Sequence, residues 1–193
     1  MEKTFKFVNL EEYLNGLIAG NDEKFQPFDA EKKDTARVTA RRGEKGEWIV
    51  SYTQDGTEET KKQVEIDPET GKEDMVVANA NMDGTVVLNA HGQKNEWTIR
   101  DSVFTATYEV DPRNPDIFKP VQQPRKFVQI PDDIEFKAPE SWGPAAGTMK
   151  ITAGGFIRVD QPEGEKYGIA FEEFMQTHTT KDVAIEQRLI DVR

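Results

Sequence analysis

Apolar residues near the start of the chain recur at the spacing of an α-helix. The predicted helix covers residues 9–20, where Asn9 can cap the first turn and Glu12 completes a capping box. Gly20 and Asn21 can end this helix, because both tolerate positive φ. Its apolar face consists of Leu10, Tyr13, Leu14, Leu17 and Ile18. We expect this face to dock on a core, and the alternative is an amphipathic helix that binds a partner protein.

The rest of the chain carries short runs of β-branched and aromatic residues separated by turn signals. Residues 22–34 are expected to form a polar connector anchored by Phe25 and Phe28, and residues 138–147 an irregular loop. The tail, residues 182–193, fits a strand or a helix. Strands are predicted at residues 37–40, 48–52, 63–66, 75–77, 127–130, 132–136, 149–151, 156–159 and 167–169.

One stretch of the chain recurs without a gap. Residues 84–108 and 154–178 align at a constant offset of 70, with four of 25 positions identical. Each copy predicts a strand, a polar turn, a second strand and a short helical or turn segment that docks a phenylalanine. The matched residues include Phe104 with Phe174, Thr107 with Thr177, and Tyr108 with His178. The repeat indicates two related small units.

These patterns predict an α+β protein that is mostly β. It would consist of two related β-rich units, each a twisted sheet or open barrel with a short docking helix, plus an N-terminal helix. The predicted parts are residues 1–34 (N-terminal helix and connector), 35–110 (first unit), 111–124 (linker) and 125–193 (second unit with the C-terminal tail). The linker is assigned because its four prolines disfavour helix and central strand.

Charge and composition narrow the function classes. The 193 residues include 36 Asp and Glu against 25 Lys and Arg, a net charge of −11. Such a surface repels phosphate, so we expect no direct binding to nucleic acid or to an anionic membrane. The absence of cysteine excludes disulfides, cysteine-ligated zinc and a cysteine nucleophile. Without a signal-peptide pattern or a stretch long enough to span a bilayer, we expect a cytoplasmic protein of a bacterial or phage-infected host cell.

The densest negative stretch is residues 55–83, with nine acids against three lysines. It favours a partner-binding surface, in one form a mimic of a phosphate backbone, as in phage-encoded inhibitors of DNA-directed defence enzymes. The alternative is a solvated hairpin. The candidate partner-binding residues are Asp55, Glu58, Glu59, Glu65, Asp67, Glu69, Glu73, Asp74 and Asp83.

No catalytic residue, metal ligand or cofactor site is assigned. The two histidines, His91 and His178, have no spacing that requires them to act together. Residues 79–84 resemble the opening of a calcium loop, but Ala90 stands where a bidentate Glu is required, so a β-turn is expected. An enzyme is therefore the less favoured interpretation. That alternative is a small hydrolase or a sugar- or nucleotide-binding protein with carboxylates in a cleft between the units.

The ends of both repeat copies resemble the small domains named for a PGDYG motif, which are uncharacterised and occur in bacterial and phage proteins. Residues 96–99 with 104–109 carry the closer similarity, and residues 165–169 with 174–178 the second. The pentapeptide is absent, and residues 81–84 and 153–156 stand near its place. The resemblance implies a compact β-rich unit whose aromatic, isoleucine and phenylalanine positions are core. It implies no activity.

Together these features favour a non-enzymatic accessory protein of the phage or prophage type that binds another protein. It would be a virion or assembly component, or an inhibitor of a host defence complex. Two linked units fit a binder with two surfaces.

Overall fold

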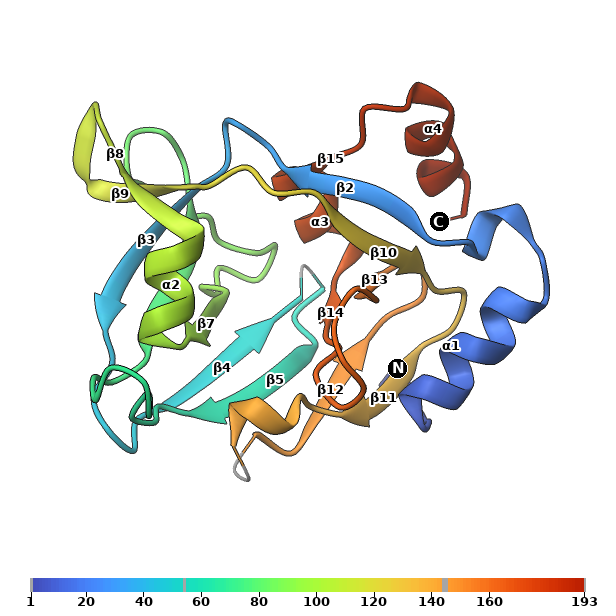
Figure 1. Ribbon diagram of the computed structural model, residues 1–193, viewed down its shortest axis with the longest axis horizontal. Coiled ribbons are helices and arrows are strands. Elements are labelled where there is room, and N and C mark those ends of the chain that lie inside the picture. The colour runs from blue at the N-terminus through green and yellow to red at the C-terminus, as the bar shows by residue number, and fades with distance from the viewer. Residues whose placement is uncertain (1, 54, 144–145, 193) are drawn as a thin grey trace. The chain divides into compact units, whose positions relative to one another are not determined.

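The computed structural model describes residues 2–53, 55–143 and 146–192 (Figure 1). Strands predominate and four α-helices accompany them, so the predicted mostly β, α+β class is confirmed. No sheet of these residues closes into a barrel. The chain divides into two compact units. We call residues 1–31 with 123–193 the discontinuous unit, and residues 32–122 the inserted unit.

The discontinuous unit is built on two sheets. The larger has the strand order β14-β13-β10-β2-β15, and the smaller the order β1-β11-β12. The larger sheet consists of β14 (Gly168–Ile169), β13 (Phe156–Arg158), β10 (Arg125–Gln129), β2 (Phe28–Lys32) and β15 (His178–Thr179). The smaller consists of β1 (Lys6–Phe7), β11 (Ile134–Lys137) and β12 (Thr148–Ile151). Helices α1 (Leu10–Ala19), α3 (Phe171–Thr177) and α4 (Val183–Val192) complete the unit, with 3-10 turns η1 (Glu23–Phe25) and η2 (Glu140–Trp142).

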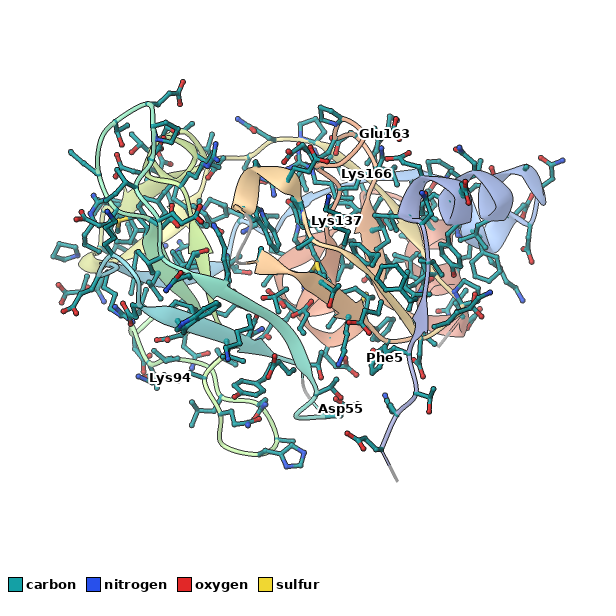
Figure 2. The ribbon with its side chains drawn as sticks, turned by 90° about the horizontal axis from the view of Figure 1, so that it is seen from below. Phe5, Asp55, Lys94, Lys137, Glu163 and Lys166 are labelled. Carbon is teal, nitrogen blue, oxygen red and sulfur yellow. The ribbon has the colours of Figure 1, made fainter. Side chains whose placement is uncertain are left out.

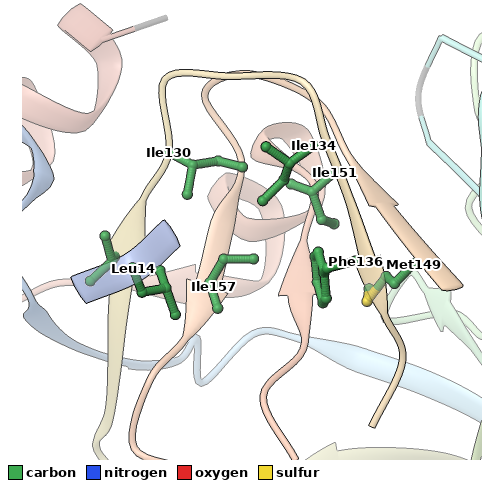
Figure 3. Packing of buried hydrophobic residues seen from close by; sticks show 8 residues of the cluster. Leu14, Ile130, Ile134, Phe136, Met149, Ile151 and Ile157 are labelled. Carbon is green, nitrogen blue, oxygen red and sulfur yellow. The ribbon is translucent and has the colours of Figure 1, made fainter. Parts of the chain in front are cut away.

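Helix α1 docks on the core of this unit, as the apolar spacing predicts. The Asn9 side chain accepts a hydrogen bond from the Glu12 N–H at 3.1 Å, which is the expected cap. Leu14 is 2% exposed and packs among residues of β10 to β13 (Figure 3). The surrounding cluster is Val128, Ile130, Ile134, Phe136, Met149, Ile151 and Ile157. Burial of this face stabilises a helix that is too short to persist alone.

Replacing glycine by alanine is expected to change the stability of this unit in opposite directions at two positions. A Cβ on Gly168 would lie 2.3 Å from Cγ1 of Ile151, whereas a Cβ on Gly16 in α1 would meet nothing within 4 Å. We expect Gly168→Ala to lower the unfolding free energy by about 1–3 kcal/mol through overpacking. Gly16→Ala should raise it by about 0.5–1 kcal/mol, because alanine loses less backbone entropy in a helix. Urea unfolding of both variants checks the pair, and equal shifts in one direction would contradict it.

A second core in the discontinuous unit is aromatic. Phe28, Phe127, Phe156 and Phe174 are each at most 4% exposed, and the rings of Phe156 and Phe174 stack at 3.9 Å. Leu189 of α4 packs against this cluster. The tail is therefore a helix, and Asp182 caps it by accepting from the Ala184 N–H at 2.9 Å.

The inserted unit has a five-stranded sheet and a separate hairpin. The sheet consists, in order, of β7 (Glu96–Ile99), β6 (Met75–Ala80), β3 (Arg37–Arg42), β9 (Asn114–Pro120) and β8 (Tyr108–Asp111). The hairpin consists of β4 (Trp48–Tyr52) and β5 (Glu58–Gln63), and α2 (Asp101–Thr107) leads into β8. The core is formed by Val38, Met75, Val77, Phe104 and Tyr108.

Three segments differ from their sequence expectation. The expected linker at 111–124 contains strand β9, and the expected connector at 22–34 contains strand β2. Prolines fit in β9 because Pro120 is its last residue and Pro115 lies beside the turn that leads from β8 into β9. The strand expected at 63–66 lies earlier, as β5, because the Thr53 N–H donates to the Thr57 carbonyl and β5 pairs in register with β4 from there. Residues 144–145 of the expected loop and residue 193 of the tail lie outside the described residues.

The two stretches aligned at an offset of 70 residues can be compared element by element. Helices α2 and α3 occupy corresponding residues, and each is followed directly by a strand. The hydroxyls of Thr107 and Thr177 each donate to the carbonyl four residues earlier at 2.7 Å. The first half differs, because residue 86 makes only an isolated bridge where the second copy has β13. In the inserted unit β6 holds the sheet position that β13 holds in the other unit.

Candidate functional site

All nine candidate acids lie in the inserted unit, but three of them are buried. Glu59 is 5% exposed, and Asp67 and Asp74 are each 1% exposed. A partner cannot reach these three side chains in the folded unit. The six acids that are exposed or half-buried are Asp55, Glu58, Glu65, Glu69, Glu73 and Asp83.

Asp67 caps helix α2 from a distant turn. Its Oδ2 accepts from the Ser102 N–H at 2.8 Å and from the Ser102 hydroxyl at 2.6 Å, while Oδ1 accepts from the Glu69 N–H at 2.9 Å. Arg100, at the N-cap position of α2, does not cap the helix with its side chain. The hydrogen bonds from Ser102 and Glu69 lower the pKa of Asp67 to about 2. This aspartate is structural, and it ties the turn at 67–72 to the helix.

The low pKa of Asp67 predicts an acid-sensitive contribution to stability. The folded pKa lies below the unfolded value, so the contribution is present above about pH 4 and disappears as pH falls towards 2. We expect Asp67→Ala to lower the unfolding midpoint by roughly 5–10 °C at pH 7, and by much less at pH 2.5. Calorimetry at both pH values measures this difference. Asp83→Ala is the control, since Asp83 bonds only within its own exposed turn, and an equal loss at both pH values for Asp67→Ala would refute the cap.

Asp74 is the second buried aspartate among the nine candidate acids, and it links β5 to the segment that enters β6. It accepts from the Glu65 N–H at 3.1 Å and lies 3.5 Å from the ammonium of Lys62 on β5. Burial lowers the pKa of Lys62, and the Asp74 carboxylate opposes that shift. Asp74 therefore holds a desolvated cation inside the unit rather than facing a partner.

Five of the six exposed or half-buried acids follow the β4–β5 hairpin from its tip to its base, and Asp83 lies apart from them in the turn after β6. Asp55 lies at the tip, where it accepts from the Thr57 N–H at 3.1 Å (Figure 2). Glu58 opens β5, and the turn beyond the base carries Glu65, Glu69 and Glu73. Trp48 begins β4 at the same base, is 48% exposed, and has the Lys61 ammonium 5.1 Å from its ring centroid. The surface of the hairpin therefore combines carboxylates with the half-exposed indole of Trp48.

The two histidines lie in different settings. His91 is exposed in a turn beside Gly56, whose φ of +83° belongs to the hairpin tip. His178 is 4% exposed, and its ring stacks on Phe174 at 4.8 Å while Nδ1 lies 2.8 Å from the Thr177 hydroxyl. Within residues 2–53, 55–143 and 146–192, no group of three or more His, Asp or Glu could hold a metal ion.

Several carboxyl groups are held in the ionised form by hydrogen bonds. Donation from Arg41 lowers the pKa of Glu47, donation from Thr85 lowers that of Asp83, and donation from Arg42 lowers that of Asp101. A general acid at neutral pH requires the opposite shift. These groups are suited to electrostatic and structural roles.

Comparison of the chain with known protein families, with curated proteins and with solved structures finds no match. Among the described helices, none has the length and apolar character needed to cross a bilayer.

Proposed function

We propose that the protein is a non-enzymatic binding module whose inserted unit binds a basic surface of another protein. The carrying observation is the set of carboxylates that remain at the surface of the β4–β5 hairpin and its base. We call Asp55, Glu58, Glu65, Glu69 and Glu73, together with Trp48, the hairpin surface. Carboxylates accelerate encounter with a cationic partner, and a tryptophan supplies apolar area that exposed charges lack.

The wider setting that we propose is a phage- or prophage-type accessory protein in the cytoplasm. Such a protein would be a virion or assembly component, or an inhibitor of a host defence complex. The resemblance of residues 96–109 and 165–178 to the PGDYG-motif domains supports this setting, as does the acidic charge. The lowered pKa values of Glu47, Asp83 and Asp101 suit these three carboxylates to electrostatic binding rather than to acid catalysis.

Matched charge variants test the hairpin surface. The test variant Glu58→Gln/Glu69→Gln/Glu73→Gln removes three of its charges without removing a buried carboxylate. The control variant Glu12→Gln/Glu163→Gln/Glu186→Gln removes three exposed charges from the discontinuous unit; Glu163 is labelled in Figure 2. Both variants and the unchanged protein are used as bait in bacterial lysate at about 50 mM and 300 mM salt.

The proposal expects one partner that the unchanged protein and the control variant capture at low salt. The test variant should lose most of this capture, and high salt should weaken it for every bait, because screening acts on exposed charge pairs. Trp48→Ala should weaken capture at both salt concentrations. Equal capture by the test and control variants, or capture that all substitutions leave unchanged, would refute the hairpin surface.

A further inference from the structure

Two strands, β2 and β9, do not pair with the strand that follows them in the sequence. Strand β2 directly precedes β3 in the sequence, yet it pairs with β10. Strand β9 directly precedes β10, yet it pairs with β3 and β8. Neither four-residue connection, residues 33–36 or 121–124, closes a hairpin (Figure 1). Strand β2 pairs instead with the remote β10, and β9 pairs on one edge with β8 through a tighter hairpin and on the other edge with the remote β3. Since local hairpins close more easily, something must disfavour them.

The residue that faces Phe127 does not distinguish the two possible pairings of β10. The observed ladder places Phe28 opposite Phe127 and Asp29 opposite Lys126. A β9–β10 hairpin closed by residues 121–124 would place Phe118 opposite Phe127 and Lys119 opposite Lys126. One phenylalanine would replace another, so the choice depends on the neighbouring charged position.

The charges at that position favour the observed ladder. The Lys126 ammonium lies 3.0 Å from the Asp29 carboxylate, and the Lys119 ammonium lies 3.2 Å from that of Glu109 on β8. The local hairpin would remove the attraction between Asp29 and Lys126 and set two lysines directly across from each other. Opposite charges at facing strand positions stabilise a pairing, and like charges destabilise it.

The other local hairpin is disfavoured as well. Closing β2 on β3 through residues 33–36 would place Lys32 opposite Arg37 and Glu31 opposite Val38. In the observed sheet, Val38 instead faces Phe118, and the Arg37 guanidinium forms a buried ion pair with Asp111 at 2.6 Å. Both alternatives therefore bring together like charges.

We propose that the facing charges of β2, β8, β9 and β10 specify the non-local pairing, and that reversing one of them opens the edge of β10 to β9. The competing β9 comes from the same chain or from a second copy of it. This inference concerns assembly of the fold and does not depend on the proposed partner. It gives Lys119 of β9 and Lys126 of β10 a role in excluding wrong pairings, as edge charges do in other sheets.

Engineered cysteine pairs report which strand lies on β10, because the natural chain has no cysteine. Ala30→Cys with Arg125→Cys reports the observed ladder, in which these residues face each other. Pro120→Cys with Arg125→Cys reports β9 on β10. Directly opposed residues of an antiparallel ladder lie about 4.5–5.5 Å apart at Cα, within the range of a disulfide. Each pair is equilibrated in glutathione buffer, and the fraction of disulfide is measured by mass spectrometry.

The test backgrounds are Lys126→Glu and, separately, Lys119→Glu. Each repels its carboxylate in the observed ladder and attracts the opposing lysine in the β9–β10 hairpin. Lys137→Glu is the control, since it makes the same charge change beside Glu140 and outside the ladder. We expect both test backgrounds to raise the 120–125 disulfide several-fold over the control and to lower the 30–125 disulfide.

The disulfide product identifies the source of the competing strand. A monomeric 120–125 disulfide shows the local hairpin, and a disulfide-linked dimer shows β9 of a second copy; both support the proposal. The proposal is overturned if neither Lys126→Glu nor Lys119→Glu raises the 120–125 disulfide above its level in Lys137→Glu. Two test positions, one in each unit, ensure that misfolding of one variant does not leave the proposal without a result.

Discussion

The Phe174→Ala variant should lose about 3–5 kcal/mol of unfolding free energy, the cost of deleting a fully buried phenylalanine. Phe174 is 1% exposed, and its ring lies 3.9 Å from that of Phe156, 5.1 Å from that of Phe127 and 4.8 Å from that of His178. The Phe28 ring lies 6.0 Å away as well, so alanine would leave a cavity against four rings, which belong to β2, β10, β13 and β15. Rigid aromatic neighbours fill such a space poorly, so the effect falls at the upper end of the range.

The matched variant in the inserted unit is Phe104→Ala. Phe104 is 7% exposed and contacts two aromatic rings, those of Tyr108 at 5.3 Å and Phe118 at 5.1 Å, so we expect about 3 kcal/mol. Urea unfolding followed by tryptophan fluorescence assigns each loss to its unit. Trp142 reports the discontinuous unit once Trp48 and Trp97 of the inserted unit are replaced by Phe. A larger shift of the Trp142 transition for Phe104→Ala than for Phe174→Ala would contradict the assignment.

Local signals in the sequence predicted local structure well. Helix α1 follows from Asn9, Glu12 and the apolar spacing, since all its determinants lie within one segment. The segments after β7 and β14 were predicted to dock a phenylalanine, and Phe104 and Phe174 are buried in α2 and α3. The tail could also have been assigned, because Asp182 precedes an apolar pair four residues apart, Ile185 and Leu189.

Strands β2 and β9 could not be predicted from their own residues. Residues 28–32 alternate weakly and carry three charges, and residues 114–120 contain two prolines. Each becomes a strand through a partner segment that is remote in the chain, β10 for β2 and β3 for β9. Strand formation there depends on cross-strand packing, which a single segment does not encode.

The acidic stretch combines two kinds of carboxylate that composition alone does not separate. Asp67 followed by Pro68 and Gly71 is a turn signal, and the turn prediction at 67–72 was available from the sequence. The capping of α2 by Asp67 was not available, because Ser102 lies 35 residues away. Burial of Asp74 likewise depends on the pairing of β5 with the segment that enters β6.

The second large effect is expected for Asp74→Ala, which should lower the unfolding free energy by about 3–5 kcal/mol at pH 7. Asp74 and Lys62 side chains are 2% and 7% exposed, and their charged atoms lie 3.5 Å apart. Alanine removes a carboxylate that stabilises the desolvated ammonium of Lys62, and it also removes the acceptor of the Glu65 N–H. Removing a carboxylate from beside a buried cation is more costly than losing an exposed ion pair of the same separation.

The pH dependence separates this cause from a simple packing defect. Burial already lowers the pKa of Lys62, and loss of Asp74 lowers it further. For a cation with a depressed folded pKa, the penalty is full below that pKa and is relieved as pH rises towards the unfolded value of about 10.4. The loss in Asp74→Ala should therefore shrink between pH 7 and pH 9.5. Urea unfolding at both pH values measures it, with the unchanged protein correcting for other titrations.

A double variant tests whether the pair as a whole stabilises the unit. Lys62→Met/Asp74→Leu replaces two buried charges by apolar side chains of similar volume, which often restores stability. We expect it to regain most of what Asp74→Ala loses, and to show no difference between pH 7 and pH 9.5. If Asp74→Ala loses the same free energy at both pH values while the double variant stays equally unstable, the cost comes from the lost N–H acceptor and packing. The Lys62 charge would then contribute nothing.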